Sequence, residues 1–292
     1  MKCSAPVDLE HGPVPCGRCM SCRINKSAKW TGKLLLEAES HADKFSYFAT
    51  FTYREPNPVS LNKNDGRLAR KALLHRIPSM RFFWIGEYGD KLERPHYHAV
   101  LFGVGLEVDI TDVLEKSWPH GFVYVDHLTP ERAAYVAQYC QKKITGPKAD
   151  NHYGSRLPEF SQMSRRPGLG DETVRRMADW YQSAAGQATL KAHHDVVGAF
   201  RTGGRTYPLT NRHIRMLRAG AGLPERRADV YVGVPLAEQP PMDLNTRADI
   251  AGRRQREHQI AKKQKIKQST TRRAGSALPG LPRPLSTGSL KG

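Results

Sequence analysis

Two histidines separated by a single residue, His96 and His98, form the clearest metal-binding pattern in the sequence. They lie in an apolar run that is typical of a β-strand. Because successive side chains of a strand point to opposite faces of a sheet, both imidazoles are expected on one face. Two imidazoles and one carboxylate leave coordination positions open for water or phosphate oxygens. The pair therefore predicts a catalytic metal site; histidines that only support the strand are the alternative.

The carboxylate is expected to come from Glu87, at the end of the preceding predicted strand. A hairpin between the two strands would bring this side chain beside the imidazoles. Asp90 and Glu93 lie closer in the sequence and are the local alternatives. A ligand set of two nitrogens and one oxygen accepts Mg²⁺ or Mn²⁺, and one of these ions is the expected cofactor.

Two tyrosines, Tyr135 and Tyr139, are spaced at i and i+4 in a helical pattern, so their hydroxyls share one helix face. A phenol with a pKa of about 10 attacks phosphorus only with help from a metal ion or a nearby cation. Lys142 and Lys143, one turn later, are expected to supply that cation or to hold the phosphate. With the metal site, the pair indicates covalent cutting and rejoining of a DNA strand. A helix that merely buries two tyrosines is the alternative.

The elements that must position these residues follow from composition and periodicity. Strands are predicted at 44–53, 80–88, 95–104 and 121–128, and helices at 21–42, 67–77, 109–118 and 129–146. This order predicts an α+β fold, an antiparallel sheet with helices on one face.

Four regions are predicted along the chain. Residues 1–23 form a cysteine-rich segment, 24–170 the catalytic domain, 171–245 a helical region of unknown role, and 246–292 a basic disordered tail. Within the third region, helices are expected at 171–185 and 211–219.

Four of the five cysteines lie in the N-terminal segment: Cys3, Cys16, Cys19 and Cys22. Cysteines this close together suit a metal site better than disulfides, which indicates a reducing compartment. A four-thiolate zinc site would hold a segment that has no core of its own. An iron–sulfur cluster or free thiols are the alternatives, and nothing else in the sequence indicates electron transfer.

The overall charge favours a polyanionic partner. The 292 residues include 46 Lys and Arg against 28 Asp and Glu, a net charge of +18. Such an excess binds nucleic acid through counterion release, and an acidic protein partner is the alternative. The sequence has no run of the roughly 20 apolar residues that a membrane span requires and no secretory signal pattern, so no membrane partner is expected.

The motifs resemble, in order and spacing, those of the HUH endonucleases. The chain is most similar to the replication initiators of small single-stranded DNA phages of the Microviridae, the gokushovirus-like group. The motifs occupy residues 48–53, 86–89, 94–98 and 135–139, with further likeness at 14–23 and 158–170. The resemblance covers about residues 1–170 and implies the ferredoxin- or RRM-like HUH fold for residues 24–170.

In that family the histidine pair and an upstream acidic residue bind the metal, and the two tyrosines alternate as nucleophiles in rolling-circle replication. The spacing of Glu87 to His96 is similar to that in related viral initiators, and Lys142 matches the lysine that follows the second tyrosine. Arg94 and Lys143 are expected to contact DNA. The implied partners are single-stranded origin DNA and the host helicase and polymerase, in the cytoplasm of a bacterial host.

Two other functions remain open from the sequence. A plasmid relaxase or an HUH transposase would use the same chemistry, although relaxases carry the nucleophile before the histidine motif. A non-catalytic, zinc-containing DNA-binding regulator would shift DNA mobility without cutting it.

Overall fold

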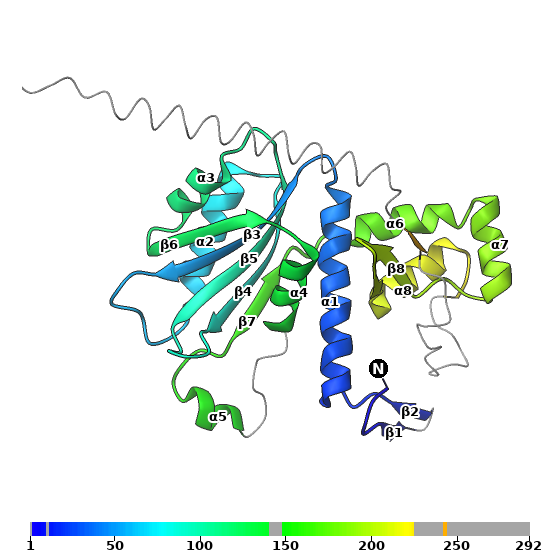
Figure 1. Ribbon diagram of the computed structural model, residues 1–292, viewed down its shortest axis with the longest axis horizontal. Helices are drawn as coiled ribbons and strands as arrows, with labels where there is room; N and C mark the ends of the chain where they lie inside the picture. Colours follow the sequence, from blue (N-terminus) through cyan, green and yellow to red (C-terminus); the bar gives the residue numbers. More distant parts are fainter. Residues whose placement is uncertain (1, 10–11, 140–147, 225–241, 244–292) are drawn as a thin grey trace, which may run out of the picture. The chain divides into compact units, whose positions relative to one another are not determined.

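The computed structural model describes residues 2–9, 12–139, 148–224 and 242–243 (Figure 1). The helices are α1 (Met20–Ser40), α2 (Lys63–Arg76), α3 (Ile110–Ser117), α4 (Pro130–Tyr139), α5 (Lys148–Tyr153), α6 (Asp171–Trp180), α7 (Ala184–His193) and α8 (Asn211–Gly220). The strands are β1 (Val7–Leu9), β2 (Gly12–Val14), β3 (Phe45–Tyr53), β4 (Arg81–Tyr88), β5 (Pro95–Val104), β6 (Gly121–His127), β7 (Phe160–Met163), β8 (Ala199–Thr202), β9 (Arg205–Pro208) and β10 (Met242–Asp243). None of the helices in the described ranges is long and apolar enough to cross a bilayer. The predicted tail, 246–292, lies outside these ranges.

One five-stranded sheet is the centre of the fold. Its strand order is β6-β3-β5-β4-β7, and every pair of neighbours is antiparallel. The predicted α+β class with an antiparallel sheet is confirmed.

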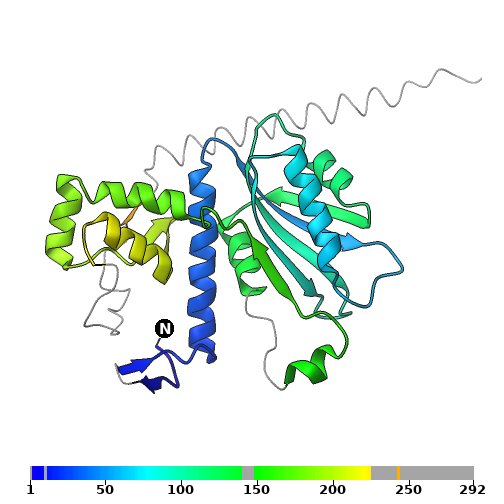
Figure 2. The same cartoon turned by 180° about the vertical axis from the view of Figure 1, so that it is seen from behind.

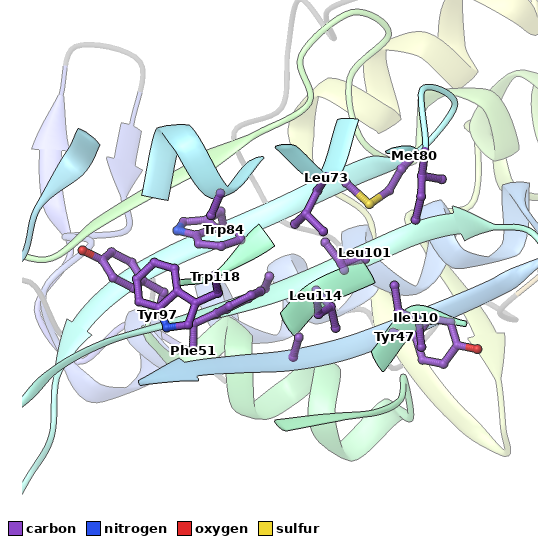
Figure 3. Close-up of a cluster of buried hydrophobic side chains, with 14 of the residues drawn as sticks. Tyr47, Phe51, Leu73, Met80, Trp84, Tyr97, Leu101, Ile110, Leu114 and Trp118 are labelled. Atoms are coloured by element: carbon purple, nitrogen blue, oxygen red, sulfur yellow. The ribbon is translucent and has the colours of Figure 1, made fainter. Parts of the chain in front are cut away.

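The larger core lies on one face of this sheet, beneath α2 and α3 (Figure 3). Leu73 from α2 and Leu114 from α3 are fully buried there against Trp84 of β4 and Leu101 of β5. Trp118, just after α3, closes this core and donates its indole N–H to the carbonyl of Thr52 at 2.9 Å.

The opposite face is covered by α1 and α4 (Figures 1 and 2). Leu34 of α1 and Val136 of α4 are fully buried with Phe83 of β4 and Val100 of β5. The prediction of helices on only one face was therefore wrong. The physical reason is visible in β5, where six consecutive residues from Ala99 to Val104 are buried. A strand buried on both sides needs cover on both faces.

Residues after the sheet pack against α1 as well. The hydroxyl of Thr173 in α6 donates to the carbonyl of Leu36 at 2.8 Å. Gly32 of α1 faces β9, where a Cβ atom would lie only 3.1 Å from Cβ of Tyr207, so a glycine is what allows this close approach. The helix predicted over 171–185 is in fact two helices, because Ser183 caps α7 by accepting from the N–H of Gly186 at 3.1 Å.

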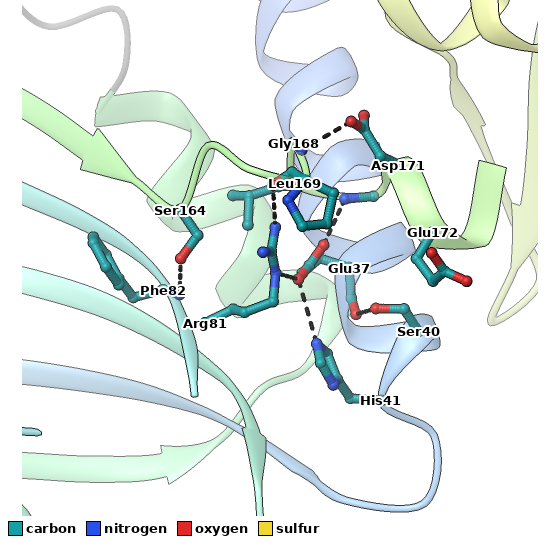
Figure 4. Close-up of polar contacts among 12 residues, drawn as sticks. Glu37, Ser40, His41, Arg81, Phe82, Ser164, Gly168, Leu169, Asp171 and Glu172 are labelled. Carbon is teal, nitrogen blue, oxygen red and sulfur yellow. Dashed lines mark hydrogen bonds and ion pairs between the residues drawn. The ribbon is translucent and has the colours of Figure 1, made fainter. Parts of the chain in front are cut away.

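A buried carboxylate ties α1 to the sheet and to the loop before α6 (Figure 4). Glu37 is 1% exposed, and its Oε1 accepts hydrogen bonds from Arg81 of β4 and from His41. Its Oε2 accepts from the N–H of Gly170 at 2.6 Å. Burial raises the pKa of this carboxyl, but the hydrogen bonds from His41, Gly170 and Arg81 outweigh it and hold the pKa below its ordinary value.

Replacing Glu37→Gln is expected to lower the free energy of unfolding by about 3 kcal/mol, because it leaves Arg81 without its buried counter-charge. The measurement is urea unfolding at neutral pH, with Glu115→Gln on exposed α3 as the control, which should change stability by less than about 0.5 kcal/mol. Because the Glu37 pKa is lowered by folding, its contribution is complete above the unfolded value of about 4.3 and is lost as pH falls through the folded value. Equal stability of the two variants would contradict this role.

Candidate functional site

The register between β4 and β5 places Glu87 directly opposite His96. The turn that joins the strands is closed by the N–H of Gly89, which donates to the carbonyl of Arg94 at 3.0 Å. Because side chains alternate along β5, His98 projects from the same face as His96. One ligand atom from each of the three side chains lies within 4.8 Å of the others. The structure thus brings the three predicted metal ligands together.

Both histidines present Nε2 to the same carboxylate oxygen. Nε2 of His96 lies 2.8 Å and Nε2 of His98 lies 3.0 Å from Oε1 of Glu87. Nδ1 of His96 lies 3.0 Å from the carbonyl of Arg94, which only accepts, so this nitrogen carries a proton. Nδ1 of His98 lies 2.9 Å from the hydroxyl of Thr50. Contacts on the second ring nitrogen are what orient metal-binding histidines in proteins.

These residues fit a divalent cation. In the neutral tautomer of His96, a lone pair on Nε2 faces a carboxylate oxygen, an arrangement that requires a proton or a cation between them. Glu87 is 2% exposed, and within the described ranges its Oε2 receives no hydrogen bond. An unsatisfied buried carboxylate oxygen costs free energy that a bound cation would remove. We call Glu87, His96 and His98 the three-donor set.

The charge state of the set also suits a metal ion. Burial raises the pKa of Glu87, but hydrogen bonds from His96 and His98 and the charges on the two rings lower it by more, so the pKa lies below its ordinary value. The carboxylate is therefore ionised at neutral pH, which is the form that binds metal.

Helix α4 lies over the sheet face that carries this set. Its first turn is capped by Thr129, whose hydroxyl accepts from the N–H of Arg132 at 3.2 Å. Ala133 and Val136 are fully buried in the core shared with α1, which fixes the rotation of the helix about its axis. The two tyrosines are consequently turned toward the histidines.

The ring of Tyr139 stacks on the imidazole of His98, with centroids 5.2 Å apart. The ring of Tyr135 lies 4.8 Å from that of Tyr139 and 5.5 Å from that of His98, in edge-to-face contact with both. The two predicted nucleophiles and the three-donor set therefore form one cluster.

The two tyrosines differ in exposure. Tyr135 is 44% exposed and Tyr139 only 7%. Burial, the hydrogen bond with Tyr135 and the negative charge of Glu87 raise the pKa of Tyr139 well above its usual value. A phenol in such surroundings is a weak nucleophile until a cation offsets the nearby charge.

The remaining predicted residues lie as follows. Glu93, an alternative ligand, instead accepts a hydrogen bond from Arg156 at 2.6 Å. The side chain of Arg94 is 55% exposed and forms an ion pair with Glu55 at 2.9 Å. Lys142 and Lys143 lie outside the described residues.

The predicted cysteine ligands also converge. The Sγ atoms of Cys3, Cys16, Cys19 and Cys22 all lie within 4.8 Å of one another. This second cluster contains thiols only, in contrast to the mixed donors at Glu87.

Two residues of the site were not predicted from the sequence. Thr50 contacts Nδ1 of His98, and Phe48 stacks on the ring of His98 with centroids 5.4 Å apart. Both lie on β3 in a motif that supported the family resemblance, but no role was assigned to them. Their even spacing, opposite a strand that carries the histidines, is the signal that would have identified them.

Comparison with known proteins first defines a class. The model of one protein family, the replication-associated proteins of the ORF2 type, matches residues 46–144. This segment begins in β3 and contains the three-donor set and both tyrosines. No solved structure matches the chain.

Particular relatives come from three phages. The chain is 29% identical over 214 residues to Replication-associated protein ORF4 of Chlamydia phage 1, covering 65% of this chain and 51% of that protein. It is 30% identical over 181 residues to Replication-associated protein ORF2 of Spiroplasma virus 4, covering 53% and 56%. It is 25% identical over 169 residues to Replication-associated protein VP4 of Bdellovibrio phage phiMH2K, covering 50% and 53%.

These matches confirm the resemblance to phage replication proteins that the motifs predicted. The chain spans about half the length of the curated relatives it matches.

The three-donor set predicts binding of one Mn²⁺ ion. Glu87→Gln keeps the size of the side chain but removes its charge, and it is expected to weaken Mn²⁺ binding at least tenfold, roughly the lower limit for disturbing a metal site. Isothermal titration calorimetry measures this change. Glu93→Gln tests the alternative ligand and should bind Mn²⁺ as the wild type does; a weaker affinity for Glu93→Gln than for Glu87→Gln would reverse the assignment.

Proposed function

We propose that this protein initiates rolling-circle replication of a small single-stranded DNA phage by nicking and rejoining origin DNA through its two tyrosines. The observation that carries the proposal is the contact of both tyrosine rings with His98 of the three-donor set. The similarity to replication-associated proteins of three phages supports the biological setting.

The proposed chemistry is transfer of a DNA phosphate to a phenolic oxygen. A divalent ion bound by Glu87, His96 and His98 would supply positive charge that stabilises the phosphate in the transition state. The oxygen of Tyr135 or Tyr139 forms a bond to phosphorus and loses its proton, while the bond from phosphorus to the 3′ oxygen breaks. The products are a 5′-phosphotyrosyl protein and a free 3′-OH.

Two adjacent tyrosines suit a reaction that must occur twice. One tyrosine holds the 5′ end while replication proceeds, and the other cuts the regenerated origin. The 3′-OH released by this second cut then attacks the first phosphotyrosine and closes a circle. No ATP is needed, since each phosphotyrosine bond conserves the energy of the bond it replaced.

The charge of the protein supports single-stranded DNA as the substrate. With a net charge of +18, the chain attracts a phosphate backbone at long range. Arg94, whose carbonyl contacts His96 and whose side chain is half exposed, is proposed to contact the strand near the metal, together with Lys142 and Lys143. The released 3′-OH would prime a host polymerase in the bacterial cytoplasm, with a host helicase separating the strands.

The alternatives differ in what happens to bound DNA. A relaxase or an HUH transposase would also form a phosphotyrosine, but the replication-associated names of the relatives favour initiation. A zinc-containing regulator would bind DNA and leave it intact.

The proposal predicts a covalent protein–DNA adduct. Single-stranded DNA carrying the phage origin, incubated with the protein and Mn²⁺, should give a slower, protein-linked band on a denaturing gel. The band should vanish with EDTA and in His96→Ala. Tyr135→Phe and Tyr139→Phe are each expected to retain some nicking, whereas the double variant should form no adduct.

Tyr207→Phe on β9 is the matched control, because its ring is as buried as that of Tyr139 at 7% exposure. This variant should form the adduct at the wild-type level. An adduct that persists in the double tyrosine variant would rule out the proposed nucleophiles, and bound but uncut origin DNA would favour the regulator.

A further inference from the structure

The N-terminal segment gathers four thiols although it buries almost no apolar surface. The hairpin of β1 and β2 pairs Val7 with Val14, which returns the chain from Cys3 to Cys16. Val7 and Leu9 are 49% and 57% exposed, so this hairpin has no hydrophobic core. Something other than apolar packing must hold such a segment in place.

The cluster joins the hairpin to the start of α1. Cys19 is the residue before the first turn of α1, and Cys22 lies within that turn and is 6% exposed. The side chain of Cys19 makes no capping hydrogen bond, and the first turn contains no acidic residue. The N-terminus of this 21-residue helix thus has none of the usual stabilising side chains.

Backbone N–H groups point at the sulfur atoms. The N–H of Cys16 lies 3.3 Å from Sγ of Cys3, and those of Arg18 and Cys19 lie 3.4 Å and 3.3 Å from Sγ of Cys16. Donors directed at sulfur favour the thiolate, the form that binds metal.

The sulfur separations fit one tetrahedral ion. Zn–S bonds of about 2.3 Å in a tetrahedron put neighbouring sulfurs about 3.8 Å apart. Sγ of Cys3 lies 3.8 Å from Sγ of Cys19, which is too long for a disulfide. A multi-iron cluster binds its thiolates on different iron atoms and spreads them further apart than four sulfurs within 4.8 Å.

We propose that Cys3, Cys16, Cys19 and Cys22 bind one structural zinc ion that fastens the N-terminal hairpin to the first turn of α1. The four thiolates leave no open coordination position, so this ion takes no part in chemistry on DNA. A Zn–thiolate group with net negative charge at the N-terminus of α1 also stabilises the helix dipole. This inference does not depend on the proposed nicking activity.

Elemental analysis of the purified full-length protein tests the proposal. The wild type is expected to contain one zinc per chain after dialysis against EDTA. Cys16→Ser should lose that zinc, while the His96→Ala, His98→Ala double variant should keep it. Cys140→Ser, a change at the fifth cysteine of the sequence, is the matched control and should also keep it.

Substitution with Co²⁺ keeps the test decisive should Cys16→Ser fold poorly. The cobalt form of the wild type is expected to show the intense sulfur-to-cobalt and tetrahedral d–d absorption of a four-thiolate site. Hydrogen exchange should then show that zinc removal exposes the amides of residues 20–27 but not those of β3 to β5. Absence of zinc, iron in its place, or zinc that depends on His96 and His98 rather than on Cys16 would overturn the proposal.

Discussion

The antiparallel register of β4 and β5 is the constraint on which the site depends. It sets Glu87 opposite His96 and Ile85 opposite His98, so one carboxylate faces two imidazoles. A slip of one residue would turn Glu87 to the other face of the sheet. The register is held on that other face by Trp84 and Tyr97, both fully buried, whose rings lie 5.9 Å apart. The aromatic core under α2 and α3 therefore positions polar groups that it never touches.

Helix α1 provides the second constraint, because it sets the place of α4. Leu34 packs into the core that contains Val136, and Glu37 binds Arg81 of β4 and the N–H of Gly170. The tyrosine helix is thus held between a long helix and the sheet, and its two phenols rest on His98. The geometry that supports phosphotyrosine chemistry is a product of packing on both faces of one sheet.

Much of the sheet and its site could be predicted from the sequence. The bounds predicted for β5 agree with the structure, and Asp109, one of the two residues considered as a cap, does cap α3. Glu87 was chosen over nearer acidic residues by strand alternation, and the structure places it beside the histidines. These predictions succeeded because local alternation and turn geometry carry the information.

Other features depend on tertiary contacts that local patterns do not encode. β7 was missed because its four residues gain their strand conformation only by pairing with β4 at the edge of the sheet. α2 begins at Lys63, earlier than predicted, because Asn62 caps it by accepting from the N–H of Asn64 at 2.8 Å. The second helical layer was missed although the buried run in β5 pointed to it. The contact of Thr50 with His98 likewise required the strand order, which the sequence alone left open.

The central claim is that Tyr135 and Tyr139 are the residues that become joined to DNA. Its most direct test is mass spectrometry of the tryptic peptides from protein reacted with origin DNA and Mn²⁺ and then digested with nuclease. The account predicts a nucleotide attached through a 5′-phosphate to the peptide of residues 133–142, at Tyr135 or Tyr139. A nucleotide attached to any other residue would contradict it.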